Sequence, residues 1–184
     1  MKISASVLGM LMTFSAAVQA ADRTYAGLQD REIKALSSQQ IGDLREGRGM
    51  GMALAAELNN YPGPRHVLDL ADALGLSTDQ QARVSVLFDE MAAQARALGA
   101  QILAAEARLN RQFAEKRVND DGLRHETGLI ARLAGDLRYV HLRYHLKVRA
   151  LMSDIQVSRY AALRGYGEAA GGHDAGHGTH GMHR

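Results

Sequence analysis

The sequence contains no cysteine and no tryptophan, and only two prolines occur among its 184 residues. The absence of cysteine excludes a disulfide scaffold, a thiol enzyme and any metal site built on thiolates. Aromatic residues make up 5% of the chain, and this scarcity of aromatics and prolines favours helix over sheet. Opposite charges nearly cancel, with 22 Lys and Arg against 20 Asp and Glu, while 46% of the residues are hydrophobic. Such a composition is typical of a folded domain.

Motifs of common catalytic sites are absent as well. The Gly-rich run at residues 47–51 follows no predicted strand and lacks the spacing of a dinucleotide loop. There is no nucleophile elbow, no Lys-Ser/Thr phosphate loop and no paired-carboxylate arrangement. Basic residues are dispersed rather than grouped with aromatics, which argues against nucleic acid as a partner. We therefore expect a protein that acts by binding alone, with no enzymatic activity and no required cofactor.

Residues 1–20 have the layout of a secretory signal peptide. Lys2 supplies the positive charge, residues 7–14 are mostly apolar, and Val18 and Ala20 are the small residues before a cleavage site. The apolar stretch is too short to cross a hydrocarbon core of about 30 Å as a helix. We predict cleavage after Ala20, export to the periplasm and no membrane insertion.

The rest of the chain divides into a helical domain at residues 21–166 and a tail at 167–184. The tail is rich in Gly and His and poor in large apolar residues, so we predict that it is disordered. Within the domain, turn residues gather only at 61–64 and 119–122. No segment alternates apolar and polar residues long enough to indicate a strand, and the predicted fold class is all-α.

Two long amphipathic patterns predict an antiparallel helical hairpin. Residues 78–118 carry apolar side chains at steps of four and three, at Val84, Phe88, Met91, Ala95, Leu98, Ile102, Ala105, Leu109 and Phe113. After a short turn, with Asp120 or Asp121 as the expected cap, a second pattern comprises Leu123, Thr127, Ile130, Ala134, Leu137, His141, Tyr144, Val148 and Leu151. So short a connection requires the helices to lie antiparallel.

The second helix has more apolar residues than one stripe can bury. Outside the pattern lie Leu129, Leu133, Val140, Leu142 and Leu146. Three things could cover them: shorter helices from residues 25–59 and 66–75, a second subunit, or a bound protein. We therefore expect a cradle-like helical dimer with a groove. Gly99, Gly128 and Gly135 inside the long helices permit either bending or close approach.

Three segments share the order apolar-Ser-x-x-Gln, which is a capping box. The Ser hydroxyl accepts from a backbone N–H of the first turn, and the Gln side chain binds the Ser backbone N–H. A cap of this kind stabilises a helix by about 0.5–2 kcal/mol. The residues are Leu36, Ser37 and Gln40, then Leu76, Ser77 and Gln80, and finally Met152, Ser153 and Gln156.

The last two boxes, with the hairpin between them, resemble the Spy/CpxP family of periplasmic proteins, which includes zinc-resistance-associated and heavy-metal-sensor proteins. The resemblance covers residues 66–165, where Leu76, Ser77 and Gln80 match the first family motif. Met152, Ser153 and Gln156 match the second, with Met152 in place of the usual Leu. Residues 24–62 have no counterpart in the best-known members.

The resemblance implies a cradle-shaped homodimer that holds unfolding proteins without ATP, or one that reports stress and metals to a membrane sensor. We therefore predict a periplasmic ATP-independent chaperone or envelope-stress adaptor whose partners are unfolded or misfolded periplasmic proteins or that sensor. The alternative is a periplasmic resistance or sensor protein that binds heavy metals.

A basic surface on the second long helix suits the first role. Between residues 121 and 152 there are six basic residues against the acidic Asp121, Glu126 and Asp136. Interleaved apolar side chains would let this surface hold proteins by weak charge and apolar contacts. An ordinary solvated face is the alternative interpretation. The predicted binding surface comprises Arg132, Arg138, Leu142, Arg143, Leu146 and Lys147.

Histidines mark two candidate metal sites for Zn, Ni or Cu. The tail carries His173, His177, His180 and His183, for which a solubilising tail or an added tag is the alternative. His141 and His145 are four residues apart on one helix face, and Asp89, Glu90, Met91 or Gln94 were expected to complete a site. His141 as a hydrogen-bonded interior histidine is the alternative there.

Overall fold

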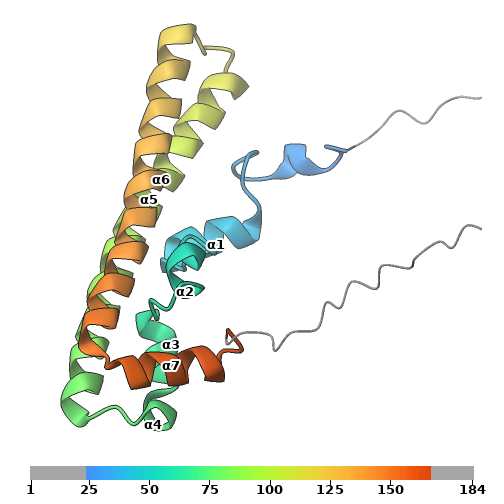
Figure 1. The fold of residues 1–184 in the computed structure, drawn as a ribbon. Coiled ribbons are helices and arrows are strands. Elements are labelled where there is room, and N and C mark those ends of the chain that lie inside the picture. The colour runs from blue at the N-terminus through green and yellow to red at the C-terminus, as the bar shows by residue number, and fades with distance from the viewer. Residues whose placement is uncertain (1–23, 167–184) are drawn as a thin grey trace, which may run out of the picture.

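A computed structural model describes residues 24–166, and every regular element among them is a helix. The two long helices are α5 (Thr78–Ala114) and α6 (Asp120–Leu151), which form the elongated hairpin in Figure 1. Shorter elements lie beside one half of this hairpin: η1 (Leu28–Asp30), α1 (Ser38–Glu46), α2 (Leu54–Glu57), α3 (Pro64–Asp69), α4 (Ala71–Leu74) and α7 (Asp154–Leu163). The predicted all-α class and the long antiparallel hairpin are confirmed.

Local chemistry sets the ends of the hairpin helices. α5 has 37 residues, which at about 1.5 Å per residue gives a rod of roughly 55 Å. It ends at Ala114, four residues before the predicted end. The N-cap of α6 is Asn119, whose side chain accepts from the Gly122 backbone N–H at 2.8 Å. The expectation of an Asp120 or Asp121 cap was wrong, because both residues already lie in the first turn, where their charge favours the helix N-terminus.

The buried stripe of α6 is wider than the single apolar pattern. Leu133 and Val140, which fell outside the pattern, are buried, whereas Thr127 and Ala134, which belonged to it, are exposed. Leu133 lies in a core cluster with Leu44 of α1 as well as residues of α5, whereas Val140 packs among residues of α5. Phe113 is 54% exposed near the free end of the hairpin. Part of the surplus apolar surface is therefore covered within the chain.

Residues 25–59 form short helices, as expected. Glycines separate α1 from α2, because Gly47 and Gly51 adopt φ values of 68° and 75° that disfavour other residues. Gly47 also closes α1, and its N–H bonds the carbonyls of Asp43 and Leu44. The chain thus breaks into α1, a turn-rich segment and the single-turn α2. Pro64, one of the predicted breaks, occupies the first turn of α3, a position where its missing N–H costs nothing.

All three capping boxes are formed. Ser37, Ser77 and Ser153 each accept a hydrogen bond from the backbone N–H three residues on, and the Gln at that position accepts from the Ser N–H. The second and third boxes are also joined to each other. Gln80 Nε2 donates to Gln156 Oε1 at 3.0 Å, and Gln156 Nε2 donates to Gln80 Oε1 at 3.1 Å. This amide pair fixes the start of α7 against the start of α5.

Gly99 allows α1 to lie directly on α5. A Cβ at this position would be 2.0 Å from the carbonyl oxygen of Leu44 on α1, a distance that no folded structure tolerates. Gly135 on α6 has open space around it. Close approach, rather than bending, is therefore the role of Gly99, and Gly135 has no such role.

We expect Gly99→Ala to destabilise the protein by about 1–3 kcal/mol, because the added methyl group must push α1 away from α5. Gly135→Ala is the matched control and should stabilise by up to about 1 kcal/mol through helix propensity alone. Urea unfolding followed by circular dichroism measures both. A Gly99→Ala protein as stable as the parent would contradict the close packing of α1.

The amide pair predicts non-additive mutations. Gln40→Ala removes only the hydrogen bond within its own box and should cost about 1 kcal/mol, whereas Gln80→Ala also breaks the contact to Gln156 and should cost more. In a double-mutant cycle, Gln80→Ala and Gln156→Ala should couple by about 0.5–3 kcal/mol. Gln40→Ala combined with Gln156→Ala should be additive, since the two share no partner.

Candidate functional site

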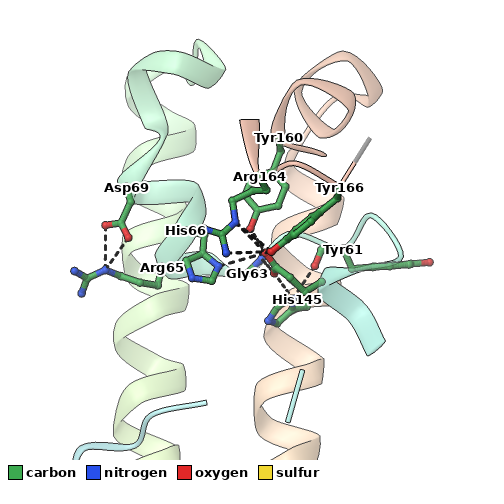
Figure 2. A network of polar contacts seen from close by, with 10 residues as sticks. Tyr61, Gly63, Arg65, His66, Asp69, His145, Tyr160, Arg164 and Tyr166 are labelled. Carbon is green, nitrogen blue, oxygen red and sulfur yellow. Dashed lines mark hydrogen bonds and ion pairs between the residues drawn. The ribbon is translucent and has the colours of Figure 1, made fainter. Parts of the chain in front are cut away.

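The carboxylate of Glu57, at the end of α2, is buried and gathers polar groups from four segments. The hydroxyl groups of Tyr160 and Tyr166 donate to its Oε1, and the Gly63 backbone N–H donates to Oε2 at 3.2 Å. Figure 2 shows His66 from α3, His145 from α6 and Tyr160 from α7 converging on this point, while Arg65 and Asp69 pair with each other to one side. A buried charge is stable only when such donors replace water.

Three basic side chains surround the same carboxylate. His66 Nδ1 lies 3.3 Å and Arg164 Nε 3.7 Å from Glu57 Oε1, and His145 Nδ1 lies 3.7 Å from Oε2. Burial raises the pKa of Tyr160 above its usual range, and the hydrogen bond to Glu57 raises it further. Tyr160 therefore remains a hydroxyl donor to this carboxylate throughout the physiological pH range.

His145 has a defined tautomer and a close neighbour. Its Nδ1 is 2.7 Å from the carbonyl oxygen of Tyr61, and since a carbonyl only accepts, Nδ1 carries the hydrogen. A Cβ on Gly63 would lie 2.9 Å from Cε1 of this ring. The Tyr-Pro-Gly-Pro turn is thus held against α6 by a hydrogen bond and by a contact that requires glycine at position 63.

His141, one turn before His145 on α6, is buried, and its Nε2 has no hydrogen-bond partner among the described residues. Burial lowers the pKa of His141 below its ordinary value, and the neighbouring His145 lowers it further. The ring is neutral at neutral pH. The alternative interpretation of His141 was a hydrogen-bonded interior histidine. The residue is interior, as that interpretation expected, but its Nε2 is not hydrogen-bonded.

A pocket of about 700 Å³ opens beside these histidines. Its walls come from the Gly-rich segment before α2, from the start of α3 and from one face each of α5 and α6. His141, His145 and Glu57 line it, together with apolar side chains such as Met50 and Met91. The segment 46–57, to which no role was assigned from sequence, therefore builds one wall of this pocket.

The metal-site predictions have different outcomes. Asp89 and Met91 line the same pocket as His141 and His145, as expected, but Glu90 and Gln94 bind the Tyr144 hydroxyl instead. Between residues 24 and 166, no group of three or more His, Asp and Glu side chains is arranged to hold a metal ion. The tail histidines, like the predicted signal peptide, lie outside the described residues, so metal binding stays a prediction.

The predicted binding surface lies on the half of α6 that faces away from its buried residues. Arg132, Arg138, Leu146 and Lys147 are exposed, and Leu142 and Arg143 are half-buried. Tyr139, which is 60% exposed, joins them. We call these seven residues the outward face of α6. Its role in binding stays a prediction.

Arg143 and Lys147 are held in place on this face. The Arg143 guanidinium lies over the rings of Tyr139 and Tyr144, at 5.4 and 5.2 Å from their centroids, and donates to Gln94 Oε1. Lys147 Nζ is 4.5 Å from the Tyr144 ring centroid and 3.6 Å from Glu90 Oε2. Cation–π contacts of this kind order long side chains that would otherwise move freely.

Sequence reasoning missed the Glu57 cluster. Glu57 follows a run of Ala and Leu residues. An acidic residue in so apolar a segment is the one local signal that could have indicated a buried carboxylate. His66 received no role, although the structure places it beside this carboxylate. Tyr160 and Arg164, four residues apart on the last helix, gave no hint of a partner about a hundred residues earlier.

No family model, curated protein or solved structure matches this chain. None of the helices between residues 24 and 166 is long and apolar enough to span a membrane.

The lowered pKa of His141 predicts a loss of stability in mild acid. In the unfolded chain this histidine takes up a proton near its ordinary pKa of 6.5, while the folded state resists protonation until a lower pH. Its contribution to the free energy of unfolding is therefore complete above about pH 6.5 and is lost as the pH falls through the folded pKa.

We expect His141→Gln to flatten this part of the stability curve, measured by urea unfolding at several pH values between 7.5 and 4.5. Exposed His125 is the control, and His125→Gln should keep the slope of the parent. An unchanged slope in His141→Gln would show that another group causes the acid sensitivity.

Proposed function

We propose that this protein is an ATP-independent chaperone or stress adaptor of the periplasm that binds unfolded or misfolded proteins on the outward face of α6. The observation that carries the proposal is the exposure of apolar side chains among cations on this face. Tyr139 and Leu146 are 60% and 57% exposed, and basic residues flank both. Exposed apolar groups that form a patch rather than occurring singly are typical of interaction surfaces.

The charge of the outward face supports the same conclusion. Of the acidic residues counted along this helix, Glu126 is turned inward and forms a two-pronged ion pair with Arg108 on α5, with both contacts at 3.1 Å. From residue 127 to the end of α6, Asp136 is the one acidic residue. The face is thus more basic than the sequence count suggested. It suits extended segments that carry both apolar and acidic side chains.

The joined capping boxes also support the proposal. The resemblance to the Spy/CpxP family rests on two copies of one motif, and in this fold the Gln of each copy binds the other. The motif therefore has a shared structural task in addition to capping. By the same resemblance we propose a homodimer, which sedimentation equilibrium would detect.

The test is an aggregation assay with purified protein and several unfolding clients, followed by light scattering. We expect the parent to suppress aggregation without ATP, and a Tyr139→Ser/Leu146→Ser variant to lose most of this effect because the apolar contacts are removed. Suppression should weaken with added salt, since exposed charges are screened.

Leu58→Ser provides the matched control. Leu58 is also 57% exposed, but it lies at the end of α2 rather than on α6. This variant should retain the activity of the parent. If the parent leaves every client unprotected, the chaperone proposal is wrong; if both serine variants act like the parent, clients bind elsewhere.

A further inference from the structure

The pocket beside His141 is separate from the outward face, because the two use opposite halves of α6. His141 and His145 belong to the buried half, and the pocket lies between that half and the Gly-rich segment. Its volume of about 700 Å³ falls within the range of roughly 300–1,000 Å³ that is usual for small-molecule sites. Neither the proposed chaperone activity nor the metal prediction requires a hollow of this size.

The pocket is lined by apolar side chains of adaptable shape. Met50 and Leu54 come from the Gly-rich segment and α2, whereas Phe88, Met91 and Ala92 come from α5. Methionine side chains adjust to occupants of different shape. Gly49 leaves room beside His141, since a Cβ there would still be 3.8 Å from Nδ1.

Most charged residues of the lining have partners within the protein. Arg48 binds Asp43 at 2.8 Å and also contacts Glu46, and Arg65 binds Asp69 at 3.0 Å. Glu57 is satisfied by the tyrosine hydroxyls and the Gly63 N–H. Asp89 and Arg96 have no ion-pair partner between residues 24 and 166, but both are exposed on α5 and remain in contact with water. A charged ligand inside the pocket would therefore lose its water shell without gaining a buried counter-charge.

One polar group inside the pocket is available to an occupant. His141 makes no hydrogen bond within residues 24–166, and its Nε2 is fully enclosed, whereas a Cβ on Gly49 of the lining would lie 3.8 Å from its Nδ1. A neutral imidazole nitrogen donates or accepts one hydrogen bond, depending on the tautomer. The interior of the pocket, with apolar side chains and this one uncharged polar group, selects for a ligand of the same character.

We propose that this pocket binds a small uncharged apolar molecule that carries one hydrogen-bonding group. The site disfavours carboxylates, sulfonates and phosphates, since inside the pocket each would lose its water while the unpaired Arg96 stays at the exposed surface. The ligand reaches the pocket beside the segment 47–54, and it contacts the short helices and the hairpin together. Binding therefore stabilises the packing of the N-terminal segment on α5 and α6.

Two fluorescent probes with closely similar aromatic frameworks test the ligand class. N-phenyl-1-naphthylamine is uncharged, and 8-anilinonaphthalene-1-sulfonate adds a sulfonate. We expect saturable binding of one uncharged probe per chain and binding of the sulfonate that is at least about tenfold weaker. In competition, 1-decanol should displace the uncharged probe, while decanoate should not.

Variants locate the probe. Leu54→Ser makes the wall polar at a side chain that is 55% exposed, so folding is preserved, and it should weaken binding several-fold. Leu58→Ser, four residues further along and outside the lining, is the control and should bind like the parent. Ala92→Met fills the pocket and should also reduce binding, with its fold checked by circular dichroism.

Several results would overturn the proposal. Equal or tighter binding of the sulfonate would show that the ligand class is wrong. Unchanged binding in both Leu54→Ser and Ala92→Met would place the probe elsewhere, and the absence of saturable binding would leave the pocket without a ligand of this class. Displacement by an unfolded polypeptide but not by 1-decanol would assign the pocket to client side chains instead. Only the last of these outcomes concerns client binding, and none changes whether the protein suppresses aggregation, so the two proposals fail separately.

Discussion

The buried carboxylate of Glu57 is the interaction on which the arrangement of the short helices depends. It receives hydrogen bonds from Tyr160 and Tyr166 at the C-terminal end of the domain and from the Gly63 N–H. Because an ionised group in the interior is costly unless donors replace its water, these segments must approach Glu57 together. The turn at residues 61–64 then meets α6 through His145. Without this convergence, the wall of the pocket formed by residues 46–57 would have no fixed position.

The two halves of α6 have different roles. Its buried half packs on α5 and on the short helices, and it supplies His141 and His145 to the pocket. Its outward half is mostly exposed, although Arg143 and Lys147 also contact α5, and it carries Tyr139 and Leu146 among arginines. One half of α6 therefore belongs to the protein interior, and the other half is a surface suited to binding different partners. This division explains why the sequence showed more apolar residues on α6 than a hairpin needs.

Much of the fold could be predicted because its signals are local. The Ser and Gln of each capping box are three residues apart, so their hydrogen bonds depend only on the first helical turn. The hairpin follows from two amphipathic patterns and a short turn. The prediction was less accurate in the width of the buried face of α6. Leu133 lies in a cluster with Leu44 of α1 and residues of α5, and Val140 packs among residues of α5 beside the predicted positions. A single stripe of positions cannot represent so wide a contact.

The sequence by itself determined where α1, α5 and α7 start, that the two longest helices lie antiparallel, and which helix face is basic. Only the tertiary structure decided that Glu57 meets Tyr160, and that Gly99 is the place where α1 touches α5. It also decided that Gln80 and Gln156 bind each other. The reason is physical: capping and amphipathicity involve residues within one or two turns, whereas a buried polar contact depends on the packing of segments far apart in the chain.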